Sequence, residues 1–274
     1  MTDKILGHIK WLKDTKIKLK TLDGKEISVF EFSHQNDIAI LAGWAKHLRN
    51  HYCDDKEIDL LREGTGCSKS EYLINFKFPD ELNAPGPSIR AGDVGEILVA
   101  DYLQYVLNYW VPRTRYCDKD VRNESTKGSD VIGFKLVVQK RESPLDRLAI
   151  YETKTQFSKG NNPKRLQDAV DGSAKDITRK AESLNAIKQR LLKKGQNQNI
   201  QLVERFQNQV DHPYSEEYGA VALFSTSCFE PEAISTVTDA SCHPNKKDLI
   251  LIVIHGEEMM KLVNDLYKRA SDEA

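Results

Sequence analysis

Residues 149–156, Ala-Ile-Tyr-Glu-Thr-Lys-Thr-Gln, pass from apolar to polar positions, are rich in Ile, Tyr and Thr, and lie between turn-rich flanks. Such a run predicts a β-strand. Because strand side chains alternate between the two faces, Glu152, Lys154 and Gln156 share one face and can contact the same ligand. A solvated face of an antiparallel sheet gives the same pattern, so the strand alone does not separate these two interpretations.

The first part of the chain, residues 1–84, predicts a small α+β portion. Two alternating segments around a Leu-Asp-Gly-Lys turn predict a hairpin over 16–32. A helical period of apolar residues predicts a helix over 36–51, and a short helix at 56–62 and a strand at 72–78 follow.

A turn rich in proline and glycine marks a boundary, and residues 85–274 form the second predicted portion. There we expect an α/β fold with the element order α-β-β-β-α-β. In chain order these elements are expected at residues 90–109, 110–117, 130–138, 149–156, 163–210 (in two or three pieces) and 219–226. A strand over 249–255 and an amphipathic helix are expected to end the chain.

The helix expected at 90–109 carries an acidic residue on an apolar stripe. Val99, Ala100 and Leu103 stand three, four and seven positions after Glu96, so we expect Glu96 to be buried. Burying an unpaired carboxylate is costly unless a cation or a metal ion meets it. A salt bridge to Arg90 or to another base at the edge of the core is one solution, and a metal site is the other.

Asp130 opens the strand expected at 130–138. The linker at 139–146 is short enough to return the chain antiparallel, which places residues near 130 opposite residues 152–155. Directly opposed residues in such a ladder lie roughly 5 Å apart. The sequence therefore predicts Asp130 beside Glu152 and Lys154.

The composition is that of an ordinary soluble protein, with 274 residues of which 39% are hydrophobic and 30% charged. No apolar run approaches the ~20 residues of a membrane span, and the first residues lack the apolar core of a secretory signal. We therefore expect a cytoplasmic protein without a membrane association. Five scattered cysteines without a Cys-x-x-Cys motif favour reduced thiols.

The net charge of −1 conceals an asymmetry, because residues 158–209 contain eleven basic and five acidic residues. A basic segment directly after the Glu-x-Lys strand fits a polyanion such as DNA. A solvated helix face is the alternative. The candidate DNA-binding residues are Lys159, Lys164, Arg165, Lys175, Arg179, Lys180, Lys188 and Arg190.

The predicted cluster of acids suits the hydrolysis of a phosphodiester, which needs a hard cation such as Mg²⁺ or Mn²⁺ and no small-molecule cofactor. The candidate metal ligands are Asp130, Glu152, the backbone carbonyl of Thr153, and Glu96. Lys154 is a candidate to orient the attacking water or to stabilise charge in the transition state. Gln156 is a candidate to position substrate or water.

The order of these pieces resembles the PD-(D/E)xK nuclease superfamily, whose core is α-β-β-β-α-β, over residues 88–227. Ser129 stands where the superfamily's name has a proline. A closer resemblance is to the HamA family, nuclease-type effector subunits of the Hachiman anti-phage defence system. The stretches that carry it are 95–98, 127–130, 152–156, 171–176 and 255–258.

The resemblance implies a DNA nuclease that works with a helicase subunit, HamB, which holds it in check until phage attack. A catalytically silent DNA-binding or helicase-docking module that keeps the nuclease fold is the alternative. A generic α/β protein with chance motif matches is a third interpretation, and it leaves Glu96 on its apolar stripe unexplained.

Overall fold

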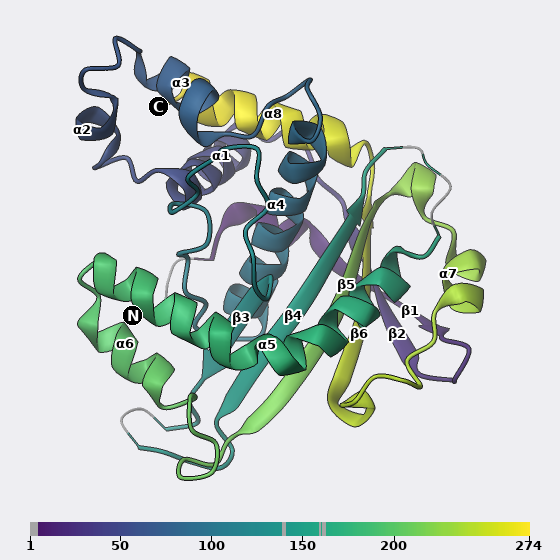
Figure 1. Ribbon diagram of the computed structural model, residues 1–274. Helices are drawn as coiled ribbons and strands as arrows, with labels where there is room; N and C mark the ends of the chain where they lie inside the picture. The colour runs from purple at the N-terminus through teal and green to yellow at the C-terminus, as the bar shows by residue number, and fades with distance from the viewer. Residues whose placement is uncertain (1–4, 139–140, 159, 161–162) are drawn as a thin grey trace.

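The structure, a computed structural model, describes residues 5–138, 141–158, 160 and 163–274. A six-stranded sheet with the order β1-β2-β6-β5-β4-β3 forms its middle layer (Figure 1). The strands are β1 (Leu12–Lys20), β2 (Glu26–Phe32), β3 (Val131–Lys135), β4 (Arg147–Gln156), β5 (Ser215–Ser225) and β6 (Leu249–Gly256). The four inner strands run parallel, and each edge strand is antiparallel to its neighbour.

Helices cover both faces of the sheet. The helices on one face are α1 (Ile38–Tyr52), α4 (Gly86–Asp101) and α8 (Met259–Asp272), and those on the other are α5 (Arg165–Lys193), α6 (Asn197–Glu204) and α7 (Pro231–Val237). Alternate residues of β4 enter the two cores: Ala149 and Tyr151 face α4, whereas Leu148 and Ile150 face α5. The strand predicted over 149–156, with side chains on two faces, is therefore confirmed, and so is the α/β fold class.

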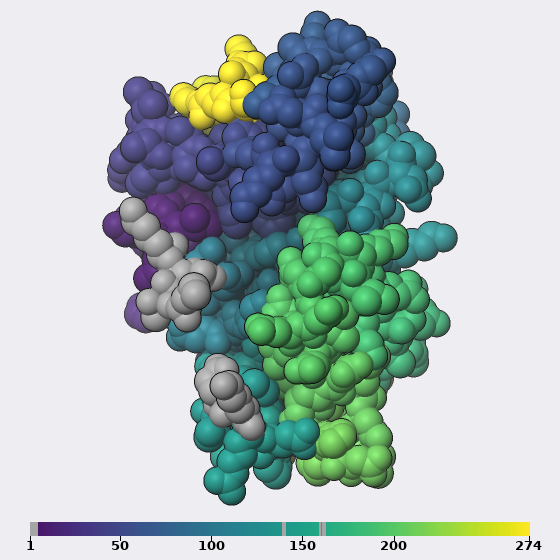
Figure 2. Space-filling view, turned by 90° about the vertical axis from the view of Figure 1, so that its left-hand side faces the viewer, coloured from purple at the N-terminus to yellow at the C-terminus, as the bar shows by residue number. Residues whose placement is uncertain are grey.

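The short helices α2 (Ile58–Arg62) and α3 (Lys69–Tyr72) lie beyond this sandwich, near α8 (Figure 1). In the space-filling view the green surface of α5 and α6 lies below the blue segment that contains α2 and α3 (Figure 2). The strand predicted at 72–78 is wrong, because Leu73–Lys77 continues α3 as a π-helical turn. A capping box between Ser68 and Glu71 starts this helix.

The strand predicted at 110–117 is also wrong. Only Trp110 pairs with the sheet, in a single bridge to Phe134. Pro112 has no N–H for a ladder, and Arg113 and Arg115 turn to buried acids instead. Two strands rather than three therefore separate α4 from α5, and the predicted α-β-β-β-α-β order lacks its first strand.

The boundary expected between residues 84 and 85 does not divide the sheet. β2 pairs in parallel with β6, and α1 packs against α8. The predicted hairpin of β1 and β2 is present and extends the same sheet as the strands of the second portion.

A buried acid fastens the N-terminal residues to the end of α4. Asp101 lies 2.9 Å from Nε2 of His8, 3.0 Å from Nε2 of His47 and 2.7 Å from Arg113. Burial alone would raise the pKa of Asp101, but His47 and Arg113 hold it well below its usual range. Burial lowers the pKa of both His8 and His51. These histidines are therefore neutral in the folded protein at neutral pH.

This cluster predicts a loss of stability in mild acid. Below pH about 6.5 His8 and His51 bind protons in the unfolded chain but stay neutral in the folded protein. The free energy of unfolding therefore falls as the pH falls. His51→Phe keeps the ring contacts and should reduce this slope by up to about 1 kcal/mol per pH unit. Urea unfolding at pH 7.5, 6.5 and 5.5 tests this, and equal slopes in both proteins would contradict it.

Candidate active site at the open edge of β4

The candidate site lies where β3 begins, so that β4 continues beyond it paired only with β5. Val131 stands opposite Tyr151, so β3 covers β4 only up to that residue. Beyond it, the backbone N–H of Thr153 donates to Oδ2 of Asp130 at 2.9 Å. The predicted antiparallel return is thus observed, and the carboxylate of Asp130 replaces the missing strand as the acceptor.

Glu152 and Lys154 lie on the face of β4 that α5 covers, and their side chains form an ion pair with each other. A Cβ at Gly172 of α5 would lie 2.6 Å from Oε1 of Glu152. Glycine at this position therefore lets the helix pass directly over the carboxylate. Gln156 shares this face, but its amide donates to the carbonyl of Gly160, in the loop after β4.

Glu96 reaches the same edge from the opposite face of the sheet. Gly95 allows the approach of α4, because a Cβ there would lie 2.5 Å from the Thr155 methyl group. Tyr116 donates its hydroxyl hydrogen to Glu96. Of the salt bridges considered for Glu96, the one to Arg90 is not formed, because Nε of Arg90 donates to the carbonyl of Pro79, and another base, Arg115, takes its place.

Arg115 joins the two acids across the edge, a role that sequence reasoning missed. Its Nε lies 2.9 Å from Oε2 of Glu96, and its Nη2 donates to Oδ1 of Asp130 at 2.9 Å. The same guanidinium also donates to the carbonyls of Thr126 and Ser129. Arg115 therefore links α4 to the loop before β3. Asp130 of that loop in turn accepts the hydrogen bond from Thr153 of β4.

Burial and neighbouring charges raise the pKa of two acids of the site, Glu96 and Glu152. Burial, with the charges of Asp130 and Asp93, raises the pKa of Glu96 to about 8 against the opposing effect of Arg115. Burial and the charge of Asp130 raise the pKa of Glu152 to about 7. Burial would lower the pKa of Lys154, but its acidic neighbours raise it, so Lys154 is protonated at neutral pH.

Asp176 of α5 is a further acid of the site that the sequence did not single out. Its Oδ1 accepts a hydrogen bond of 3.0 Å from Ser129, whose N–H donates to Oγ of Ser183. Its Oδ2 is buried without a hydrogen-bond partner among the described residues. Burial raises the pKa of Asp176 to about 6. The available signal was the helical spacing that puts Asp176 with the buried Ser173 and Ser183.

The donor set fits a hard cation with two carboxylate ligands. Asp130 and Glu152 are oxygen donors whose mutual repulsion a cation would relieve, and Mg²⁺ commonly keeps several waters. Within the described ranges, no three His, Cys, Asp or Glu side chains stand at metal-binding distances. Glu96 already contacts Arg115 and Tyr116, so it supports the site one contact away from Asp130.

The predicted basic face of α5 is not continuous. Lys180 pairs with Glu216, Lys188 lies 2.9 Å from Glu204, and Arg165 lies 3.2 Å from Asp168. Lys159 is outside the described residues, and Lys164 is the N-cap residue of the helix. The remaining predicted residues, Lys175 and Arg179, are exposed, whereas Arg190 lines a pocket beside Asp130.

These features define a three-layer α/β protein with clustered carboxylates and a lysine at an open strand edge. The family model HamA matches residues 7–270, so the chain belongs to the HamA family, which is associated with Hachiman defence. No curated protein sequence gives a significant match. No helix in the described part of the chain is long and apolar enough to cross a membrane.

The arginine bridge predicts a large loss of stability when it is removed. Arg115→Met leaves Glu96 and Asp130 buried without their cation, which should lower the free energy of unfolding by about 3 kcal/mol. Adding Glu96→Gln should recover part of that loss, because one of the two unpaired carboxylates is then gone.

Urea unfolding in EDTA measures both effects. Arg179→Ala is the control, since it removes an exposed charge and should change stability by no more than ~0.5 kcal/mol. An Arg115→Met protein as stable as the wild type would show that the bridge does not support the fold.

Proposed function

We propose that this protein is a Mg²⁺-dependent (or Mn²⁺-dependent) deoxyribonuclease, the effector of an anti-phage defence system under the control of a HamB-like helicase partner. The observation that carries the proposal is the Glu152–Lys154 ion pair beside Asp130, at a strand edge that no other strand covers. Membership in the HamA family supports the defence setting.

The side chains divide the work of hydrolysis. Asp130 and Glu152, with the carbonyl of Thr153, would hold the metal ion, which supplies charge neutralisation and a more acidic bound water. Lys154 keeps its proton at neutral pH, so it donates hydrogen bonds to the water or to the phosphoryl oxygens and does not act as a base. Arg115 and Glu96 fix Asp130 in place.

A catalytically silent module for binding DNA or docking a helicase is the second candidate function. The buried acids argue against it, because Glu96 and Glu152 are held at a pKa of about 8 and 7, which costs folding free energy. Groups held at such a cost are typical of functional sites. Cleavage of plasmid DNA by the purified chain with Mg²⁺ decides between the two.

The proposed roles predict different failures for the two residues of the Glu-x-Lys pair. Glu152→Gln should lose metal affinity, because a neutral amide is a poor ligand for a hard dication. Lys154→Ala should keep the metal and lose about 100-fold or more of the cleavage rate, since one preorganised charge-stabilising group is gone. Calorimetric titration with Mn²⁺ and single-turnover cleavage measure the two quantities.

Lys268→Ala, an exposed change on α8, serves as the control for both assays. A fully active Lys154→Ala protein would reduce Lys154 to an ordinary residue of the strand face. Unchanged Mn²⁺ binding by Glu152→Gln would remove Glu152 from the metal site.

The basic residues of α5 predict a graded loss of DNA affinity. Lys175→Ala with Arg179→Ala removes two exposed charges and should weaken binding to all sequences and flatten its salt dependence by about two counterions. Lys180→Ala with Lys188→Ala removes charges already paired with Glu216 and Glu204, so its effect should be smaller. Fluorescence anisotropy at several salt concentrations measures both, and equal losses would contradict this division of the helix.

A further inference from the structure

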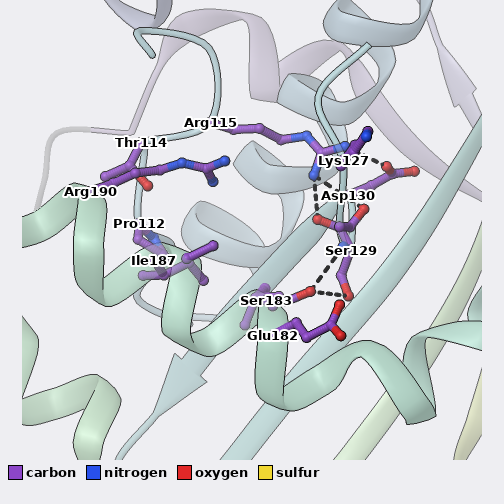
Figure 3. A pocket seen from close by; sticks show the side chains of 13 residues that line it. Pro112, Thr114, Arg115, Lys127, Ser129, Asp130, Glu182, Ser183, Ile187 and Arg190 are labelled. Carbon is purple, nitrogen blue, oxygen red and sulfur yellow. Dashed lines mark hydrogen bonds and ion pairs between the residues drawn. The ribbon is translucent and has the colours of Figure 1, made fainter. Parts of the chain in front are cut away.

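A pocket of about 270 Å³ opens directly beside Asp130, between residues 112–115, the loop at 127–130 and the C-terminal half of α5 (Figure 3). Asp130 and Arg115 line this pocket and also belong to the candidate active site. A group bound in the pocket would therefore be the immediate neighbour of a phosphodiester at Asp130.

Two cations of the pocket have no ion-pair partner in the part of the chain that the structure describes. Among the described residues, neither Lys127 nor Arg190 has a carboxylate within salt-bridge distance, although both line the pocket. Arg190 is half-buried, and its pKa is lowered by burial and by the positive charge of Arg115; the charge of Asp118 partly offsets this. A cation that has no carboxylate partner and stands near a second guanidinium favours the binding of an anion.

The other residues that line the pocket indicate which chemical groups the anion has besides its charge. Pro112, Ile132 and Ile187 give the pocket an apolar part, and Pro112 and Ile187 lie next to Arg190 (Figure 3). The lining holds three basic residues and two acidic ones, Asp130 and Glu182, a net charge of +1 that matches one phosphodiester. The volume is near ~300 Å³, the lower end of small-ligand sites, which suits one nucleotide better than a bare phosphate.

We propose that this pocket binds one unpaired nucleotide of a DNA strand, with its phosphate at Arg190 and Lys127 and its base against Pro112 and Ile187. A base in a duplex has to leave its partner to enter such a pocket, whereas a base in a single strand is already free. The substrate class is therefore single-stranded DNA. This inference rests on the proposed nuclease function, because it assigns the nucleotide next to the phosphodiester that is cut.

Binding in EDTA tests the pocket without any need for catalysis. Deoxythymidine 5′-monophosphate should bind the full-length protein with a Kd on the order of 1 mM or tighter and compete with oligo(dT). Arg190→Ala should weaken this binding about tenfold or more, because a charge-assisted hydrogen bond is lost. Lys127→Ala, an exposed change, provides a second variant if Arg190→Ala unfolds. Lys268→Ala on α8 is the matched loss of charge outside the pocket.

Two comparisons separate the parts of the proposal. Inorganic phosphate that binds as tightly as the nucleotide would overturn the role of the apolar wall. A duplex that binds as tightly as oligo(dT) of equal length, or a preference for oligo(dT) that persists in Arg190→Ala, would overturn the single-strand assignment.

Nuclease activity and pocket binding can fail independently of each other. A protein that binds the nucleotide through Arg190 but cuts no DNA with Mg²⁺ would refute the proposed function and leave the pocket intact. A protein that cuts DNA but shows no nucleotide binding, and whose Arg190→Ala variant cuts at the wild-type rate, would refute the pocket.

Discussion

The guanidinium of Arg115 is the contact on which the candidate site depends. Glu96 comes from the helix layer on one face of the sheet, and Asp130 comes from the loop before the edge strand. Without a cation between them, these two carboxylates would repel each other at the place where β4 has no strand on its β3 side. Arg115 therefore lets the chain keep acids together at an open edge, where a phosphate can approach the strand.

The start of β3 at Val131 and the two glycines beside the site both bring the candidate residues close together. Because β3 starts only at Val131, the N–H of Thr153 is left to Asp130, and this hydrogen bond sets the height of the carboxylate along β4. Gly95 and Gly172 let one helix on each face approach the strand closely. The site is thus compressed between two helices, and β3 does not pair with β4 beyond Tyr151. A strand at 110–117 beside β3 would still leave residues 152–156 without a partner on that side. This is because β3 itself begins only at Val131, opposite Tyr151.

The sequence predicts those parts of the site that follow from the two-residue repeat of a strand and from short linkers between strands. The alternation at 149–156 gives the shared face of Glu152 and Lys154, and the short linker gives their register with Asp130. The role of Arg115 could not be predicted from the sequence, because its partners lie 19 positions before it and 15 positions after it, in other elements. Its segment also resembles a strand, although Pro112 prevents pairing. The buried pairing of His47 with Asp101, 54 positions apart, was hidden for the same reason.

One rigid helix fixes the distance between the acids and the neighbouring pocket. Gly172 lies over Glu152, Asp176 and Ser183 bond to Ser129, and Arg190 lines the pocket, so successive turns of α5 face successive parts of the site. These positions are four, seven and seven residues apart, which keeps them on one side of an α-helix. Since α5 is continuous over 29 residues, the acids and the pocket cannot be displaced independently along it. The spacing of one helix therefore sets how far the proposed nucleotide would stand from Glu152 of β4.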